Sequence, residues 1–370
     1  MCNRLNVDNP FYDGNASASA FGWLFQVDAA IFLFLQYIDE IKEITVEGKF
    51  QDIELLLKND KRIFAQAKSV QNGSLSNRNA KLEDAVISLV KTPYRSNDEL
   101  LYISNYESPI SRKDLFKNSV VKLKNVEDEK QEFEQQIKRI KNKLKDYIDK
   151  CAKVPDKNKY TLLLERIEKI DIDNFMISTI YPYIDTEQPF DRFREIENKI
   201  SHILTVRFNI QSQHLQKFVR ELLLEWHQTF LVDATITPDK KSKTQSKEEL
   251  LWQMVAVLSN MDLNIDNLFD EEIDSDQIDE YEMYYTKQSF IHQRFDFFNR
   301  LISDFKKFKK CNAKKNKYDF IKLHWSDYLS EFNEYDTYPD LAKEYLIKKN
   351  LLRLINNKTN ISKIMEGQDL

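Results

Sequence analysis

Apolar and polar residues follow two different patterns along the chain, and the change falls near residue 110. From Ser17 to Ile38 apolar residues occur almost all round a helical projection, which predicts a largely buried helix. Strand-like alternation and helical spacing then follow each other in the order strand 43–46, strand 52–58, strand 62–70, helix 82–90 and strand 99–104. This order is typical of an α/β domain.

Beyond residue 120 the spacing is mostly helical. Residues 126–150 are dense in Glu, Gln and Lys, which favours a solvated helix or a coiled-coil arm. Residues 175–183 alternate weakly and indicate a short strand, and from Phe190 onward apolar residues recur every three or four positions. We therefore expect an α/β domain over 1–120, a helical arm and connecting segment over 121–188, and a helical domain for assembly or partner binding over 189–370.

Composition narrows the class of protein. A hydrophobic content of 42% across 370 residues is enough for several cores, and the scarcity of Gly (5) and Pro (8) favours helices. The net charge of −5 provides no global attraction for nucleic acid, so any DNA binding has to be local or assembled with partners. Three distant cysteines, Cys2, Cys151 and Cys311, favour neither a zinc site nor disulfides. We expect a soluble, cytoplasmic protein, since the apolar stretch Ala29 to Leu35 is too short to span a bilayer.

The strands at 52–58 and 62–70 are separated by the turn signal Asn59-Asp60 and predict an antiparallel hairpin. In the first strand Ile53, Leu55 and Leu57 share one face, and in the second strand Ile63, Ala65 and Ala67 do. Burying them on one face requires even-numbered residues to oppose even-numbered ones, because a one-residue slip would mix the two faces. The expected polar face pairs Asp52 with Lys68 and Glu54 with Gln66.

These side chains suit hydrolysis of a phosphodiester. A carboxylate such as Asp52 and an amide oxygen such as that of Gln66 can bind Mg²⁺ or Mn²⁺, because both ions accept oxygen ligands. Lys68 can stabilise the attacking water or the charge that develops on the phosphate. The alternative interpretation is that Asp52 and Lys68 form a cross-strand surface ion pair, worth less than about 1 kcal/mol.

Three segments carry a resemblance to a known superfamily: Gly22-Trp-Leu-Phe-Gln26, Gln51-Asp52-Ile53 and Ala65-Gln66-Ala67-Lys68. Together they resemble the (D)…QxK form of the PD-(D/E)xK nucleases. The similarity is greatest to the double-stranded DNA nuclease domain of bacterial anti-phage effectors, which occur in cyclic-oligonucleotide-triggered systems and in systems with a HerA-type ATPase. It covers about the first hundred residues.

The resemblance implies a restriction-endonuclease-like mixed sheet flanked by helices. It assigns catalysis to Asp52, Gln66 and Lys68, a metal to Asp52 and Gln66, and a supporting role to Gln26. The sequence departs from the Glu form of the superfamily at Gln66, which implies a loosely held metal. Glu54 is a further supporting candidate, although the family motif does not require it and a solvated strand carboxylate is the simpler interpretation.

We therefore expect a Mg²⁺-dependent DNA endonuclease in anti-phage defence, acting as an oligomer with a protein partner such as a HerA-like ATPase. A cyclic-oligonucleotide trigger, a non-catalytic interaction scaffold and RNA as substrate remain as alternatives. Elsewhere, Lys306, Lys307, Lys309 and Lys310 lie in a lysine-rich run that either contacts a phosphate backbone or is a solvated helix end.

Overall fold

The computed structural model describes residues 17–69, 74–110, 114–150, 157–181, 193–210, 215–234, 244–259, 268–269, 295–332 and 338–366. Its contacts divide the chain into two compact units. Unit 1 comprises Met1–Gln36 and Thr45–Ile196, and unit 2 comprises Tyr37–Ile44 and Glu197–Leu370. Each unit has its own set of buried apolar side chains.

Strands among the described residues form a mixed sheet in the order β5-β6-β4-β3-β2-β1-β7. The strand bounds are β1 Ile41–Val46, β2 Ile53–Leu57, β3 Arg62–Lys68, β4 Glu99–Ser104, β5 Val120–Lys122, β6 Phe175–Thr179 and β7 Gln245–Ser246. In unit 1, β3, β4 and β6 are mutually parallel, whereas β2 and β5 are antiparallel to their neighbours. The expected mixed sheet flanked by helices, followed by a mostly helical region, is confirmed.

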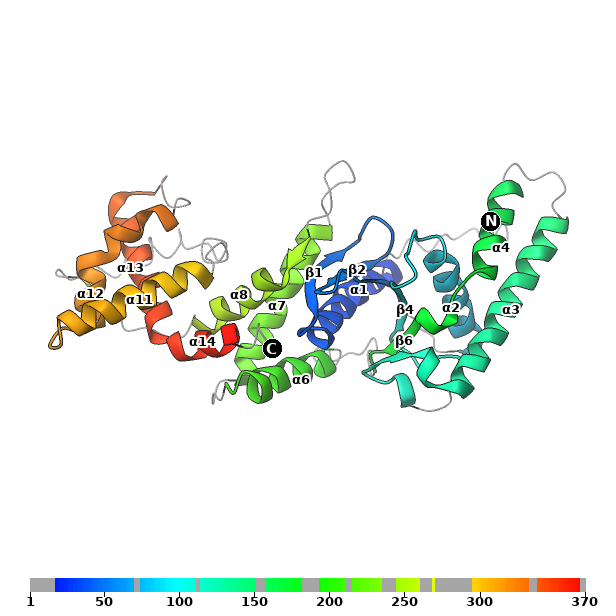
Figure 1. Cartoon of the computed structure of the whole chain (residues 1–370), viewed down its shortest axis with the longest axis horizontal. Helices are drawn as coiled ribbons and strands as arrows, with labels where there is room; N and C mark the ends of the chain where they lie inside the picture. Colours follow the sequence, from blue (N-terminus) through cyan, green and yellow to red (C-terminus); the bar gives the residue numbers. More distant parts are fainter. Residues whose placement is uncertain are drawn as a thin grey trace. The chain divides into compact units, whose positions relative to one another are not determined.

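Helices of unit 1 cover both faces of its sheet (Figure 1). They are α1 Ser17–Gln36, α2 Leu75–Leu89, α3 Glu127–Lys150 and α4 Lys157–Glu168, with short 3₁₀ turns at Asp114–Phe116, Leu123–Asn125 and Ile172–Asn174. Helix α2 connects the parallel strands β3 and β4, which places the carboxyl ends of both strands at one edge of the sheet.

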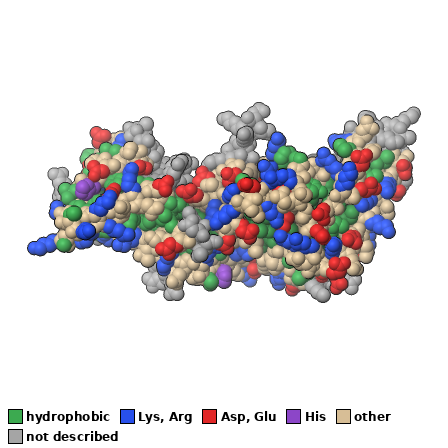
Figure 2. Space-filling view, viewed as in Figure 1, with side chains coloured by type: hydrophobic (Ala, Val, Ile, Leu, Met, Phe, Trp, Pro, Cys, Tyr) green, Lys and Arg blue, Asp and Glu red, His purple; other side chains and the backbone are tan. Residues whose placement is uncertain are grey.

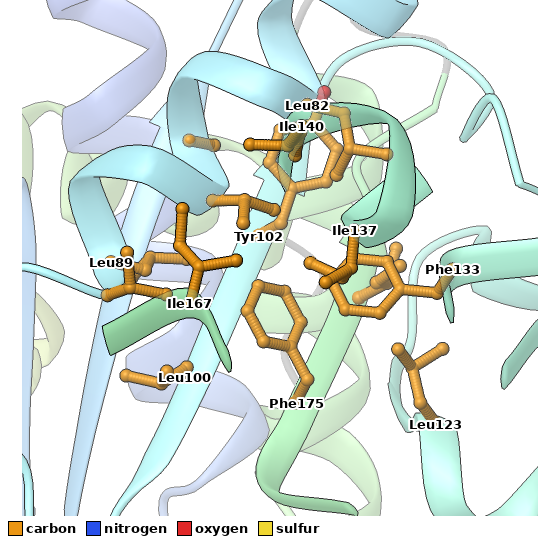
Figure 3. Close-up of a cluster of buried hydrophobic side chains, with 14 of the residues drawn as sticks. Leu82, Leu89, Leu100, Tyr102, Leu123, Phe133, Ile137, Ile140, Ile167 and Phe175 are labelled. Carbon is orange, nitrogen blue, oxygen red and sulfur yellow. The ribbon is translucent and has the colours of Figure 1, made fainter. Parts of the chain in front are cut away.

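The core of unit 1 includes a face of α3. Phe133, Ile137 and Ile140 are spaced one or two turns apart and are buried against the sheet, where the Phe133 and Phe175 rings lie 4.5 Å apart (Figure 3). The interpretation of 126–150 as a solvated arm is therefore wrong for this face. Strand β6 lies within 121–188, and strand β5 begins at residue 120. The segment expected to be an arm and connection therefore supplies part of the sheet.

Helix α1 packs against β3 on the other face of the sheet, since Phe64 and Tyr102 face α2 and α3 while the alternating Ala65 and Leu101 point away from them. Its window Ser19–Gln36 is long and apolar enough to cross a membrane by length and composition, with a mean hydropathy of 1.3. Within the described residues it is the one helix that passes this test, and 61% of the window is buried inside the protein, as in a core helix.

Unit 2 is mostly helical. Its elements are α6 Arg194–His202, a π-helical turn Ile203–Arg207, α7 Leu215–Ala234, α8 Lys247–Ser259, α11 Phe295–Cys311, α12 Lys317–His324, a 3₁₀ segment Trp325–Glu331, α13 Asp340–Asn356 and α14 Lys358–Glu366. Trp226 and Trp252 are buried in its core, and the Trp226 indole donates to the Leu250 carbonyl at 3.2 Å. The amphipathic spacing beyond Phe190 thus corresponds to packed helices.

Candidate active site

The hairpin of β2 and β3 brings three of the predicted site residues together. The Gln66 side-chain amide donates a hydrogen bond to Oδ2 of Asp52, and the backbone N–H of Ala67 donates to the same oxygen at 3.0 Å. Asp52 is half-buried and Gln66 is buried. Lys68 ends β3 beside them and interacts electrostatically with the Asp52 carboxylate. Asp52, Gln66 and Lys68 therefore converge at the carboxyl end of β3.

The register of this hairpin differs from the predicted one by two residues. Ile53 pairs with Ala65 and Glu54 pairs with Phe64, so even positions do oppose even positions and the apolar faces match. The expected opposition of Glu54 and Gln66 is wrong, and so is that of Asp52 and Lys68, because this register places Asp52 opposite Gln66, to which it is hydrogen-bonded. The hydrophobic pattern fixes only the parity of the register, because a shift by two leaves every side chain on the same face.

Glu54 stabilises the turn between β1 and β2 instead of lying against Gln66. Its Oε1 accepts the backbone N–H of Phe50 at 2.6 Å and that of Gln51 at 3.2 Å. A Cβ at Gly48 would lie 2.6 Å from the Glu54 side chain, so a larger residue there would force that side chain to shift. Glu54 therefore holds the turn that precedes Asp52, and no hydrogen bond or ion pair joins it to Gln66 or Lys68 among the described residues.

Gln51 anchors the same turn to helix α2. This buried side chain donates to the Ser88 carbonyl at 3.0 Å and to Oγ1 of Thr92 at 2.6 Å, and it accepts from the Ser88 hydroxyl at 3.3 Å. Since Asp52 is the next residue, these bonds hold its backbone against α2. The position of Asp52 thus depends on the core of unit 1.

Helix α1 supplies two further polar side chains. The Gln26 amide hydrogen-bonds the Asp52 carboxylate, so it lies at the position where a supporting role was expected; the role itself stays a prediction. Its Oε1 is buried and has no hydrogen-bond partner among the described residues. Trp23, one helical turn earlier, hydrogen-bonds the carboxylate of Glu47.

Glu47 is the site residue that the sequence analysis missed. Its backbone N–H donates to the Asp52 carbonyl at 2.7 Å across the turn, and its φ of 52° lies in the left-handed region. Its charge interacts with those of Asp52 and Lys68. A non-glycine residue held at positive φ beside a charged cluster is a recurring feature of functional sites. The adjacent Gly48 made the segment resemble an ordinary turn in the sequence.

Both carboxylates of the site are disfavoured in their charged forms. Burial raises the pKa of Asp52, and the charge of Lys68 together with hydrogen bonds from Ala67, Gln26 and Gln66 only partly opposes this effect. The pKa of Glu47, an exposed residue whose carboxyl group is partly enclosed, is also raised, first by burial and then by the negative charge of Asp52. The site therefore has more negative charge than Lys68 alone compensates.

This donor set fits a hard divalent cation. Two carboxylates short of positive charge and the orphaned amide oxygen of Gln26 are oxygen ligands of the kind that Mg²⁺ and Mn²⁺ accept. Within the described part of the chain, no group of three or more His, Cys, Asp or Glu residues is arranged to hold a metal. A bound Mg²⁺ would thus retain several waters, which is its usual state in phosphoryl-transfer sites.

The predicted nucleic-acid contacts lie in unit 2, near the turn between α11 and α12. Lys309 caps its own helix end through the carbonyls of Ala313 and Lys315, and Lys307 pairs with Asp304 at 3.3 Å. Lys306 and Lys310 are exposed, and no hydrogen bond or ion pair of their side chains is found among the described residues. Figure 2 shows Lys and Arg side chains gathered at this end of α11 and α12 on the face that it draws.

Comparisons with known proteins identify no family for the chain. No family model matches it, and no curated protein matches it. Among solved structures the chain is similar to a Cap4 SAVED/CARF-domain containing receptor of Moraxella osloensis, with a TM-score of 0.32 and 14% identity over 73% of this chain. The match spans 61% of that receptor.

Proposed function

We propose that the chain is a divalent-metal-dependent nuclease that hydrolyses phosphodiester bonds of DNA at the Asp52 site. The observation that supports this most strongly is the convergence of Asp52, Glu47 and the orphaned Gln26 oxygen beside Lys68, with the pKa values of both carboxyl groups raised. A pair of acids whose charges are mutually unfavourable, next to one lysine, fits a site that takes up a cation and a phosphate together.

Each residue has a separate task in this proposal. Asp52 and Glu47 would bind Mg²⁺ or Mn²⁺, and Gln66 and Gln26 would hold the Asp52 carboxylate in place while presenting amide oxygens to the ion. The bound metal would polarise the scissile phosphate and lower the pKa of an attacking water. Lys68 would direct its ammonium group toward the phosphate oxygens and stabilise the negative charge of the transition state.

The resemblance of the first hundred or so residues to anti-phage nuclease domains gives the proposal a biological setting. We place the chain in bacterial anti-phage defence, as an effector that cuts DNA after assembly with itself and activation by a protein partner such as a HerA-like ATPase. The alternative is a cyclic-oligonucleotide trigger. The two triggers are separated by adding either the ATPase or cyclic oligonucleotides to the purified chain before the cleavage assay.

Plasmid cleavage tests the enzyme directly. Purified chain, alone and with each activator, is incubated with supercoiled plasmid and Mg²⁺ or Mn²⁺, in parallel with single-stranded and RNA substrates. Cleavage should fall by about a hundredfold or more in Lys68→Ala and Asp52→Ala, as expected when a transition-state hydrogen bond or a metal ligand is removed. Lys58→Ala is the matched control, since Lys58 is an exposed lysine at the far end of the same hairpin.

Two results would contradict the proposal in different ways. If Lys68→Ala and Asp52→Ala both cut DNA as well as the wild-type chain does, the site is wrongly assigned. If no substrate is cut with either activator, the interpretation of the chain as a non-catalytic scaffold is favoured. The site would fit that interpretation, because no group of three or more His, Cys, Asp or Glu is arranged to hold a metal among the described residues.

A further inference from the structure

A second concave site lies in unit 1, between α2, α3 and α4. It is a cavity of about 610 Å³ with an apolar floor that includes Ile87, Leu144 and Leu163. This volume is within the range of small-molecule pockets, about 300–1,000 Å³. None of the residues that line it belongs to the Asp52 site. The cavity therefore requires an explanation of its own.

The rim of this cavity is strongly cationic. It carries Lys91, Lys143, Lys159 and Arg166 but, among its lining residues, a single carboxylate, Glu83. Glu83 is already paired with Lys143. Lys91, Lys159 and Arg166 are exposed and keep their charge available for a ligand, although one Arg166 nitrogen donates to the Lys91 carbonyl at 2.7 Å. The electrostatics favour an anion.

Two tyrosines complete the lining and point to the rest of the ligand. Tyr147 of α3 and Tyr160 of α4 are half-buried, with ring centroids 4.8 Å apart. Aromatic side chains beside lysine and arginine are the combination that binds a planar base and its phosphates. Duplex DNA fits less well, because an apolar floor gives no contact to a phosphate backbone.

We propose that this cavity is a binding site for a free nucleotide. Its phosphates would be held by Lys91, Lys159 and Arg166, and its base would lie against the tyrosines and the apolar floor. This proposal is independent of whether the Asp52 site cuts DNA.

The cavity is also connected to the Asp52 site through one helix. Ile87 and Lys91 of the α2 segment line the cavity, and the residues that follow each of them, Ser88 and Thr92, hold Gln51 next to Asp52. A nucleotide that shifts or stiffens the end of α2 would therefore change the position or the mobility of the turn that carries Asp52. The site is thus placed to regulate the Asp52 site.

Calorimetric titration with ATP tests the binding. Wild-type full-length chain should bind ATP, and the double variant Lys91→Gln/Lys159→Gln should bind it about tenfold more weakly or worse, since charge-assisted hydrogen bonds to the phosphates are removed. Lys138→Gln is the matched control, because Lys138 is an exposed lysine on α3 that does not line the cavity. Tyr160→Ala should weaken binding more than Tyr160→Phe.

Two outcomes would overturn the assignment. One is the absence of ATP binding to wild type at concentrations on the order of 1 mM. The other is equal affinity in wild type and the double variant, which would locate the nucleotide elsewhere. The connection to the Asp52 site is tested by hydrogen exchange: bound ATP should change the exchange of the Gln51 and Asp52 amides, and unchanged exchange would refute it.

Discussion

The Asp52 site of unit 1 and the lysine-rich turn of unit 2 carry charge in opposite ways. Around Asp52 the charged and amide groups are tied to one another or to the core, through Ala67, Gln66 and Gln26. At the turn between α11 and α12, Lys306 and Lys310 are exposed, and only neighbours such as Lys309 have fixed partners. The side chains around Asp52 are held in place by the fold, whereas the Lys306 and Lys310 side chains are surrounded by solvent.

This difference separates two kinds of recognition. Preorganised ligands favour a small ion or a reacting group whose position must be fixed within about half an ångström. Exposed lysines attract a polyanion without fixing it, and their contribution falls as salt is added. In a nuclease the two would be complementary, since one cuts and the other retains the DNA. Substitutions on each side of this contrast should therefore have different signatures.

The largest expected effect concerns the scaffold of the Asp52 site. Phe133→Ala removes a ring that is fully buried between α3 and the sheet, so it should lower the free energy of unfolding by about 3–5 kcal/mol. The adjacent exposed residue gives the control, Glu132→Ala, which should leave stability nearly unchanged. Denaturant unfolding measures both. Equal stability of the two variants would restore the interpretation of α3 as a solvated arm.

The next effect concerns Gln51, which anchors the turn that carries Asp52. Gln51→Ala removes the amide that donates to the buried Thr92 hydroxyl, which should cost about 1–3 kcal/mol, whereas the Ser88 carbonyl still accepts the Lys91 N–H at 3.1 Å. Cleavage should fall by more than this loss of folded protein explains, because Asp52 would lose its fixed position. Gln135→Ala, at an exposed glutamine of α3, is the control in thermal unfolding and in the cleavage assay. Unchanged cleavage per folded molecule would show that the anchor does not position Asp52.

The fixed carboxylates also predict a pH dependence. The pKa of Glu47 is about 4.5 in the unfolded chain and is raised in the folded protein. Between the unfolded-state and folded-state pKa the folded protein binds more protons than the unfolded chain, so its stability falls as pH rises through that window. Glu47→Gln should therefore be more stable than wild type at neutral pH without metal, by less than about 1 kcal/mol because water screens an exposed carboxylate.

Thermal unfolding at several pH values checks this sign. The advantage of Glu47→Gln should vanish below about pH 4, where the wild-type carboxyl is protonated in both states. Adding Mn²⁺ should stabilise wild type more than the variant. A variant that is less stable at neutral pH, or equally stabilised by Mn²⁺, would show that Glu47 is not a strained metal ligand.

The smallest effect belongs to the lysine turn. If Lys306 and Lys310 bind DNA phosphates, Lys306→Gln/Lys310→Gln should reduce the slope of log affinity against log salt by about 0.9 for each phosphate that is no longer neutralised. Lys309→Gln should not change the slope, because Lys309 caps its own helix end. Metal-free binding to a labelled duplex at several salt concentrations measures the slope. Equal slopes in wild type and the double variant would leave the turn as a solvated helix end.

Much of the hairpin could be predicted because its signals are local. The apolar alternation predicts the parity of the pairing, and Asn59-Asp60 does form the turn, with Asp60 at a φ of 59°. The alternation does not predict that the other face is covered as well, where Phe64 is buried. The register could not be fixed beyond its parity. Glu47 was not predictable from spacing, because it approaches Asp52 through a left-handed backbone that follows from the turn's tertiary contacts.

Helix α3 shows a different reason for error. Its charged residues dominate the composition, yet Phe133, Ile137, Ile140 and Leu144 recur at helical spacing and are buried. A stripe this narrow is diluted by the charges around it, so composition obscured the periodicity. Strand β5 has three residues and is recognised only by its pairing with β6, which lies more than fifty positions away in the sequence.

Anomalous scattering from Mn²⁺ in crystals of the chain grown with Mn²⁺ and a short DNA duplex would locate the metal that the nuclease proposal requires. We predict a peak about 2.0–2.3 Å from a carboxylate oxygen of Asp52, with Glu47 or an amide oxygen of Gln26 or Gln66 completing the protein ligands. A peak at other residues, or full cleavage activity with no peak at Asp52, would contradict the assignment of this hairpin as the active site.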